Sequence, residues 1–169
     1  MNRSMIIRTA GCMAVAGLGA VGAGLAAAGT GTTTNAGTAA HTGTTETPKT
    51  TRASATLSAA QETPAPTGVG KAKGTFTATL TDGGKLTYRL TFSGLSGRAV
   101  AAHIHAGKTG VSGPVLVPLC ATACTSPAKG TTTVKASVVA ALRAGTTYVN
   151  VHTAANPAGE IRGQVKNRR

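Results

Sequence analysis

Apolar and polar residues alternate along residues 75–81 and again along residues 85–92, on either side of a turn at Asp82, Gly83 and Gly84. A period of two places successive side chains on opposite faces of a β-strand. Asp-Gly and Gly-Gly steps are typical of the tight turns that join antiparallel strands. The pattern therefore predicts a long hairpin whose inner face is apolar and whose outer face carries Thr, Lys and Arg.

Shorter stretches of the same alternation, separated by Gly and Pro, recur along the rest of the chain. They predict further strands near residues 56–60, 100–105, 115–119, 131–137, 146–152 and 160–165. Residues 138–144 have a helical pattern, and Gly145 is placed to end that helix. Roughly seven or eight short strands favour an all-β fold, either an antiparallel sandwich or a Greek-key barrel.

The first 28 residues are predicted to be a secretory signal peptide. Arg3 and Arg8 form a positive start, residues 9–25 are uncharged and rich in apolar and small side chains, and Ala26-Ala27-Ala28 offers a cleavage site. The alternative is an uncleaved membrane anchor, but the span is Gly-rich and short for a membrane helix, which needs about 20 apolar residues. We expect a secreted, extracellular protein, free or associated with the cell wall, with no transmembrane segment after cleavage.

Composition divides the rest of the chain into three parts. Residues 29–52 are almost wholly Thr, Gly, Ala and Asn and contain no large apolar side chain. Such a segment buries too little surface to offset its ordering entropy, so it is predicted to be a disordered linker. Strand patterns fill residues 53–165, the predicted folded domain, and residues 166–169 form a basic tail that we expect to be solvated.

Two cysteines, Cys120 and Cys124, remain after removal of the predicted signal peptide. An even pair in an exported protein favours a structural disulfide, here one that closes a small loop. Metal binding or redox activity is the alternative, but no histidine stands next to the pair, and the surrounding Thr, Ser and Pro residues are typical of a loop.

The charge balance is strongly basic, with 17 Lys and Arg against 4 Asp and Glu. Removing the two arginines of the signal peptide leaves 15 minus 4, a net charge of +11. This charge favours partners that are polyanions, such as a cell-surface polymer or an acidic polysaccharide. Specific nucleic-acid binding is not expected, because the chain has only two Phe, two Tyr and no Trp for base stacking and its cations are scattered.

Three of the four histidines lie on predicted strands. His103 and His105 are two residues apart and share one face of their strand, and His152 ends the segment 148–152. That segment and residues 160–164 are predicted to pair as a hairpin, which brings polar side chains about 5 Å apart on one face. The expected opposed pairs are His152 with Glu160, Asn150 with Arg162, and Tyr148 with Gln164.

Two interpretations of this polar face remain open. The histidines can form a structural hydrogen-bond network with Asn150, Glu160 and Arg162, because half-buried polar groups need partners. Alternatively, His103, His105 and His152 hold a single copper or zinc ion, which Glu160 would orient or bind. Metal-free catalysis is not supported, because no Ser or Cys accompanies the histidines as a nucleophile.

Several motifs, in order along residues 53–165, resemble the CHRD domain, which is named after chordin and is widespread in secreted microbial proteins. They are Leu57-Ser58-Ala59-Ala60-Gln61-Glu62-Thr63-Pro64, Leu86-Thr87-Tyr88, Gly94-Leu95, Ala101-Ala102-His103-Ile104-His105, Gly113-Pro114-Val115, Leu142 with Gly145, Tyr148-Val149-Asn150-Val151-His152-Thr153, Asn156-Pro157 and Gly159-Glu160-Ile161-Arg162-Gly163-Gln164. The resemblance implies an extracellular, immunoglobulin-like β-barrel. The two cysteines and the Thr-rich leader lie outside the matched pattern.

The His-x-His strand is also similar to a strand of copper/zinc superoxide dismutase. The dinuclear site of that enzyme needs a larger histidine set and an aspartate ligand. After His103, His105 and His152 the domain has no further histidine, and Asp82 is the sole aspartate of the chain. We therefore predict that the protein is not an enzyme but a non-catalytic extracellular binding or cell-surface module, whose partner is an extracellular protein or a polyanionic surface polymer. A mononuclear copper or zinc protein is the alternative.

Overall fold

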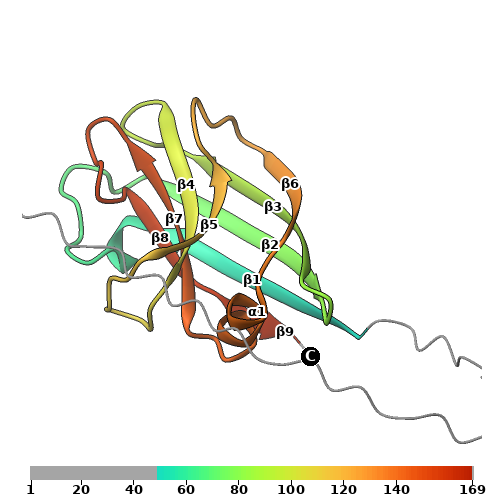
Figure 1. The fold of residues 1–169 in the computed structure, drawn as a ribbon. Helices are drawn as coiled ribbons and strands as arrows, with labels where there is room; N and C mark the ends of the chain where they lie inside the picture. Colours follow the sequence, from blue (N-terminus) through green and yellow to red (C-terminus); the bar gives the residue numbers. More distant parts are fainter. Residues whose placement is uncertain (1–48, 169) are drawn as a thin grey trace, which may run out of the picture. The chain divides into compact units, whose positions relative to one another are not determined.

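The structure is a computed structural model that describes residues 49–168, so the predicted signal peptide and most of the predicted linker lie outside the described residues. In chain order the elements are β1 (Thr50–Ser58), the 3-10 turn η1 (Ala59–Gln61), β2 (Lys73–Thr81), β3 (Lys85–Ser93), β4 (Ala99–Ala106), β5 (Val115–Cys120), β6 (Ala128–Thr133), α1 (Ala136–Arg143), β7 (Thr147–Thr153), β8 (Ile161–Gln164) and β9 (Lys166–Arg168) (Figure 1). Within this range no helix has the length and apolar character needed to cross a membrane.

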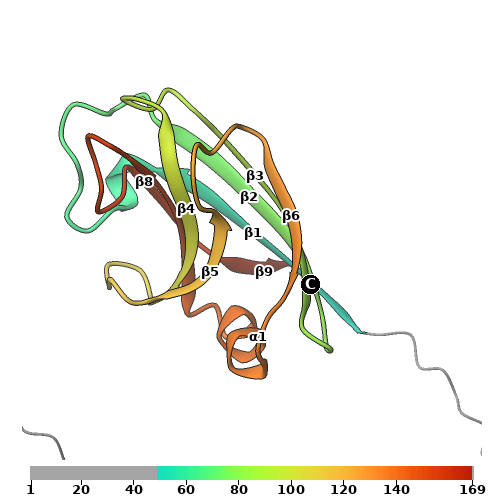
Figure 2. The same cartoon turned by 45° about the horizontal axis from the view of Figure 1, so that its top comes forward.

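The strands form one antiparallel sheet in the order β5-β4-β7-β8-β1-β2-β3-β6, with β9 added beside β1. The sheet curls, so that its two end strands, β5 and β6, contact each other and nearly close a barrel (Figure 2). This confirms the predicted all-β, antiparallel fold. The predicted hairpin is β2 and β3, in which Phe76 pairs with Leu90 and Ala78 with Tyr88.

The barrel interior is built from the apolar half of each alternating strand. Phe76, Leu90, Ile104, Val149 and Ile161 are completely buried there, while the residues between them on β2 and β3 are mostly exposed Thr, Lys and Arg. Helix α1 buries Val138, Val139 and Leu142 against the core. Gly145 follows the helix with a φ of +67°, a left-handed conformation that ends helices and suits glycine, as predicted.

Several boundaries differ from the sequence predictions. Strand β1 begins at Thr50, inside the stretch predicted to be linker, because it pairs with β2 over its whole length. Strand β6 runs from Ala128 to Thr133 rather than from residue 131 to 137, because α1 already starts at Ala136 and turns Val138, Val139 and Leu142 toward the core. The tail residues Lys166–Arg168 are exposed, as expected, but they form β9, which pairs with β1.

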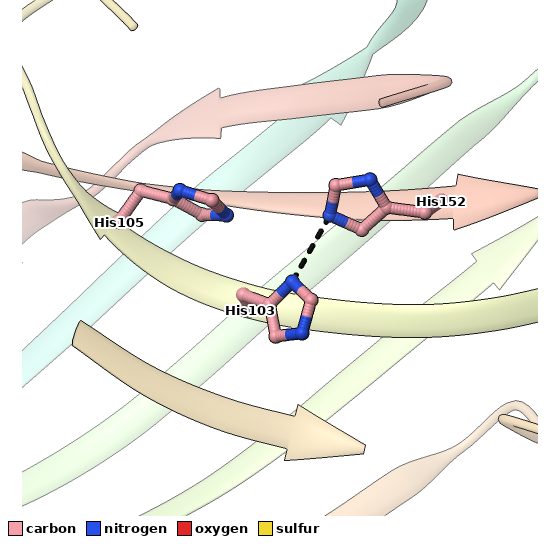
Figure 3. Close-up of side chains that lie close together, drawn as sticks. All are labelled: His103, His105 and His152. Atoms are coloured by element: carbon pink, nitrogen blue, oxygen red, sulfur yellow. Dashed lines mark hydrogen bonds between the residues drawn. The ribbon is translucent and has the colours of Figure 1, made fainter. Parts of the chain in front are cut away.

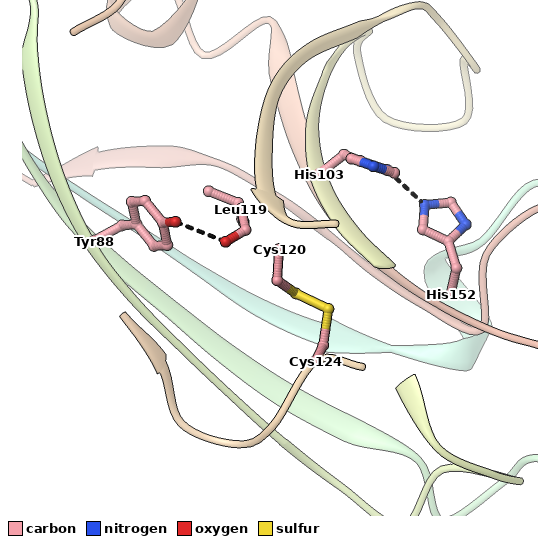
Figure 4. The surroundings of a disulfide bond; sticks show 6 residues. All are labelled: Tyr88, His103, Leu119, Cys120, Cys124 and His152. Atoms are coloured by element: carbon pink, nitrogen blue, oxygen red, sulfur yellow. Dashed lines mark hydrogen bonds between the residues drawn. A yellow bond between two sulfur atoms is a disulfide. The ribbon is translucent and has the colours of Figure 1, made fainter. Parts of the chain in front are cut away.

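The disulfide between Cys120 and Cys124 confirms the predicted pairing; the two Cα atoms are 5.7 Å apart. It closes the loop that follows β5, and the Cys124 N–H donates to the Ala99 carbonyl at the start of β4 at 3.0 Å. Nearby, the Tyr88 hydroxyl of β3 donates to the Leu119 carbonyl of β5 at 2.6 Å (Figure 4). These contacts hold the edge strand β5 against the rest of the barrel.

Candidate metal centre

Strands β4 and β7 lie side by side and bring the three histidines of the domain together on their outward face. His103 lies opposite Asn150 in the β4–β7 register, and His105 lies opposite Tyr148. His152 is two residues further along β7 than Asn150, so it lies diagonally across from His103 (Figure 3). The inward-pointing residues between them, such as Ile104 and Val151, belong to the core.

The imidazole rings converge closely. The Nδ1 atom of His103 and the Nε2 atom of His152 are 3.1 Å apart, and one ring nitrogen from each histidine lies within 4.8 Å of the others. Two ligands bound to zinc at 2.0–2.1 Å with tetrahedral geometry are separated by about 3.3 Å. The His103–His152 pair is therefore already at a coordination separation, and His105 is within a small side-chain movement of it.

Backbone carbonyls fix the protonation of two of these rings. His105 Nδ1 is 2.9 Å from the Gly113 carbonyl oxygen, and His152 Nδ1 is 3.0 Å from that of Pro157. A carbonyl oxygen only accepts, so each of these Nδ1 atoms must carry the proton. Both Nε2 atoms then carry a lone pair: that of His105 is free, and that of His152 accepts a hydrogen bond from His103 Nδ1, which a bound metal would replace. Hydrogen bonds from Nδ1 to a carbonyl are the usual means of orienting a metal-binding histidine.

The Nε2 atom of His105 has no hydrogen-bond partner among the described residues, although it is buried. Buried polar atoms are rarely left without a partner, because their desolvation is then uncompensated. The purely structural network predicted as one alternative does not account for this atom. A cation bound among the three rings would use its lone pair.

Two members of the cluster, the half-buried His103 and the buried His152, favour the neutral state that metals bind. Burial lowers the pKa of His103, and the neighbouring His152 and His105 lower it further. Burial also lowers the pKa of His152; the hydrogen bond to Pro157 opposes this shift, and His105 adds to it. Both rings are therefore neutral at pH 7 and offer lone pairs without first losing a proton.

The Glu160 carboxylate does not join the histidines, contrary to the expectation that it orients or binds the metal. It is completely buried and accepts four hydrogen bonds: from the N–H of Ser96 at 2.5 Å, the hydroxyls of Ser96 and Thr153 at 2.6 Å each, and the side-chain amide of Asn156 at 3.0 Å. Burial raises the pKa of Glu160, but these hydrogen bonds together lower it below its ordinary value. Glu160 thus fastens the loop after β3 to the β7–β8 turn.

The other predicted polar residues surround the histidines. Two of the three predicted pairs are confirmed where β7 pairs with β8: Asn150 lies opposite Arg162, and Tyr148 opposite Gln164. The third, His152 with Glu160, is not formed, because the strand pairing ends at Val151 and Ile161. The Tyr148 ring stacks on His105 with centroids 5.0 Å apart and also carries the Arg162 guanidinium 3.5 Å from its centre. Gln164 donates from Nε2 to nearby backbone carbonyls, including that of Gly107 at 3.0 Å. These residues support the site without touching a common ligand position.

The sequence prediction missed Glu62, which follows η1 and lies against this polar face. Its carboxyl group is close enough to Asn150 and to Arg162 for both to affect its pKa. Gly159, in the β7–β8 turn, has a φ of +138°, which favours glycine, and a Cβ atom there would lie 2.3 Å from the Glu62 Oε1 atom. Burial raises the pKa of Glu62 to about 7, against the lowering effects of Arg162 and of hydrogen bonds to Thr63 and Asn150.

This shift predicts a pH-dependent effect of Glu62→Gln. Between pH 4.5 and about 7 the folded protein holds a proton at Glu62 that the unfolded chain has lost, so rising pH costs the wild type stability. Thermal unfolding of both proteins is followed by circular dichroism. We expect the difference between the melting midpoint of the variant and that of the wild type to increase steadily as the pH rises over this range. A difference that stays constant with pH would contradict the raised pKa.

An antiparallel, nearly closed β-barrel with histidines gathered on the outer face of two neighbouring strands, β4 and β7, defines the class of this protein: an all-β domain. The sequence model of the CHRD domain matches residues 53–165, and the chain therefore belongs to the CHRD family, whose domains are of extracellular type. No curated protein and no solved structure matches the chain.

Proposed function

We propose that this CHRD domain is a non-catalytic, extracellular binding module that holds a single copper or zinc ion on His103, His105 and His152. The observation that carries the proposal is the buried, unpartnered Nε2 atom of His105, in a ring oriented by the Gly113 carbonyl. Imidazole nitrogens suit both metals, and a site with these ligands should bind Cu(II) more tightly than Zn(II).

The neighbourhood of the cluster favours one ion rather than two. Within the described residues, the three histidines are the sole group of potential metal ligands that lie close together. Asp82, the sole aspartate, forms an ion pair with Arg143 of α1. A dinuclear dismutase-type centre has no further ligands to draw on in this part of the chain.

We propose a binding role rather than catalysis because the other reactive side chains of the domain are already engaged. The Glu160 carboxylate is fully engaged by hydrogen-bond donors, and Cys120 and Cys124 are joined in a disulfide. Neither can act as an acid, a base or a nucleophile at the histidines. The disulfide and the secretory pattern of residues 1–28 support an extracellular location, where disulfides persist.

The test is metal retention by the untagged full chain. The protein is equilibrated with one equivalent of Cu(II) or Zn(II), desalted, and analysed for metal by atomic absorption. We expect close to one ion per chain for the wild type, and loss of retention in both His103→Ala and His152→Ala, because two imidazoles hold a metal far less tightly than three.

A matched control removes a histidine that is not in the cluster. His41→Ala should retain the same amount of metal as the wild type, because His41 is in the N-terminal segment and not on β4 or β7. Circular dichroism on each variant separates loss of ligands from loss of fold. The metal centre would be refuted if the folded wild type retained no metal. It would also be refuted if folded His103→Ala and His152→Ala retained as much metal as the wild type.

A further inference from the structure

A second polar surface lies away from the histidines, on the outer face of β9, β1, β2, β3 and β6. Strand β8 separates β1 from β7 in the sheet order, and none of the three histidines lines the depression on this face, so it is distinct from the candidate metal centre. We call it the basic face and define it by its four cations, Arg52, Arg89, Lys129 and Arg168. All four side chains are exposed.

The cations of the basic face oppose one another across strand pairs. Arg52 of β1 lies directly opposite Arg168 of β9, and Arg89 of β3 lies directly opposite Lys129 of β6. Like charges in directly opposed positions destabilise a sheet. In residues 49–168 no carboxylate forms an ion pair with any of the four, since the salt bridge found there joins Arg143 to Asp82. The fold therefore tolerates two repulsive pairs on one face.

The cations surround an open depression of about 650 Å³ in the sheet surface. Threonines of neighbouring strands line it: Thr79 of β2 lies opposite Thr87 of β3, whose hydroxyl is 3.1 Å from that of Thr131 of β6. The one aromatic residue in its lining, Tyr88, directs its hydroxyl to Leu119 and so points into the barrel (Figure 4). The surface offers positive charge and hydroxyl groups, but no aromatic ring for stacking.

We propose that the basic face binds an acidic polysaccharide, a linear polymer that bears carboxylate or sulfate groups. The four cations are spread over five adjacent strands, a width of about 19 Å at the usual spacing between strands. A single small anion cannot span that distance, whereas a chain with repeated negative charges can contact all four cations and relieve both repulsive pairs. Threonine hydroxyls suit the hydroxyl groups of sugars, and the lack of exposed aromatic rings disfavours single-stranded nucleic acid, which needs stacking.

The test measures binding of the untagged full chain to immobilised polygalacturonate and to dextran sulfate at several salt concentrations, with neutral dextran as a blank. Arg89→Gln combined with Lys129→Gln should weaken binding about tenfold at low salt and reduce its salt dependence, because fewer counterions are displaced. Removing the Arg89–Lys129 repulsion should also leave the melting midpoint unchanged or raise it, so that weaker binding is not a sign of misfolding.

The matched control removes the same charge elsewhere. Arg98→Gln combined with Lys108→Gln changes two exposed cations outside the basic face, and we expect less than a twofold effect on binding. Equal weakening by both pairs of changes would mean that binding follows net charge alone, and would overturn the proposal. Tighter binding of a single-stranded oligonucleotide than of either polysaccharide at the same salt concentration would overturn the assigned ligand class.

Discussion

Replacement of Glu160 by alanine is expected to destabilise the domain by about 1 to 3 kcal/mol, the range for leaving buried hydrogen-bond donors without their acceptor. The carboxylate is completely buried and accepts hydrogen bonds from Ser96, Thr153 and Asn156. Removing it leaves these donors without an acceptor and releases the loop before β4 from the β7–β8 turn. Urea denaturation followed by circular dichroism would measure the loss.

Glu160→Gln is the conservative comparison. It keeps the shape but offers one acceptor oxygen where the wild type offers two, so we expect a smaller loss. Because the pKa of Glu160 is below its ordinary value of 4.5, the advantage of the wild type over this variant should be present above pH 4.5 and disappear as pH falls through the folded-state pKa. An unchanged midpoint for Glu160→Ala at pH 7 would show that the network contributes nothing to stability.

The Glu160→Ala variant also distinguishes a structural role of Glu160 from a role in metal binding. If the carboxylate only holds the loop, Glu160→Ala protein kept folded at low temperature should still retain one metal ion, because its side chain lies outside the histidine cluster. Loss of metal from the folded variant would instead assign Glu160 a part in the metal centre and contradict the placement seen here.

Local patterns allowed the strands and one register to be predicted. The alternation along residues 75–92 and the turn between β7 and β8 involve neighbours in the sequence, so the pairing of Asn150 with Arg162 could be predicted from simple antiparallel geometry. That His103 and His105 share a face follows equally from the period of two. The closeness of His152 to these two histidines could not be predicted from the sequence, because β4 and β7 are neighbours only through the topology of the sheet.

Long-range contacts were beyond reach for the same reason. The strongest partner of Glu160, Ser96, is 64 residues away in a loop with no periodic pattern. Glu62 lies in a Pro-containing segment that carries no strand signal, yet it reaches Asn150 and Arg162. The opposed cations of the basic face depend on the pairings of β9 with β1 and of β6 with β3, neither of which joins strands adjacent in the chain.

Arg162 is the second residue whose removal should have a large effect. Its side chain is 2 % exposed, and its guanidinium donates to the carbonyls of Lys108 and Val111 at 2.9 and 2.8 Å. These hydrogen bonds tie the loop between β4 and β5 to β8. The same loop contains Gly113, whose carbonyl orients His105. Arg162 therefore supports the candidate metal centre as a positioning residue.

We expect Arg162→Met to destabilise the domain by about 3 to 4 kcal/mol, because it removes two charged hydrogen bonds and the contact with the Tyr148 ring while keeping most of the apolar volume. Arg162→Lys keeps the charge but cannot reach both carbonyls in the same way, so it should recover part of the loss. In the folded Arg162→Met variant the metal should dissociate faster than in the wild type, because the loop that orients His105 is released. If Arg162→Met is less stable but loses its metal at the same rate as the wild type, Arg162 has a structural role only.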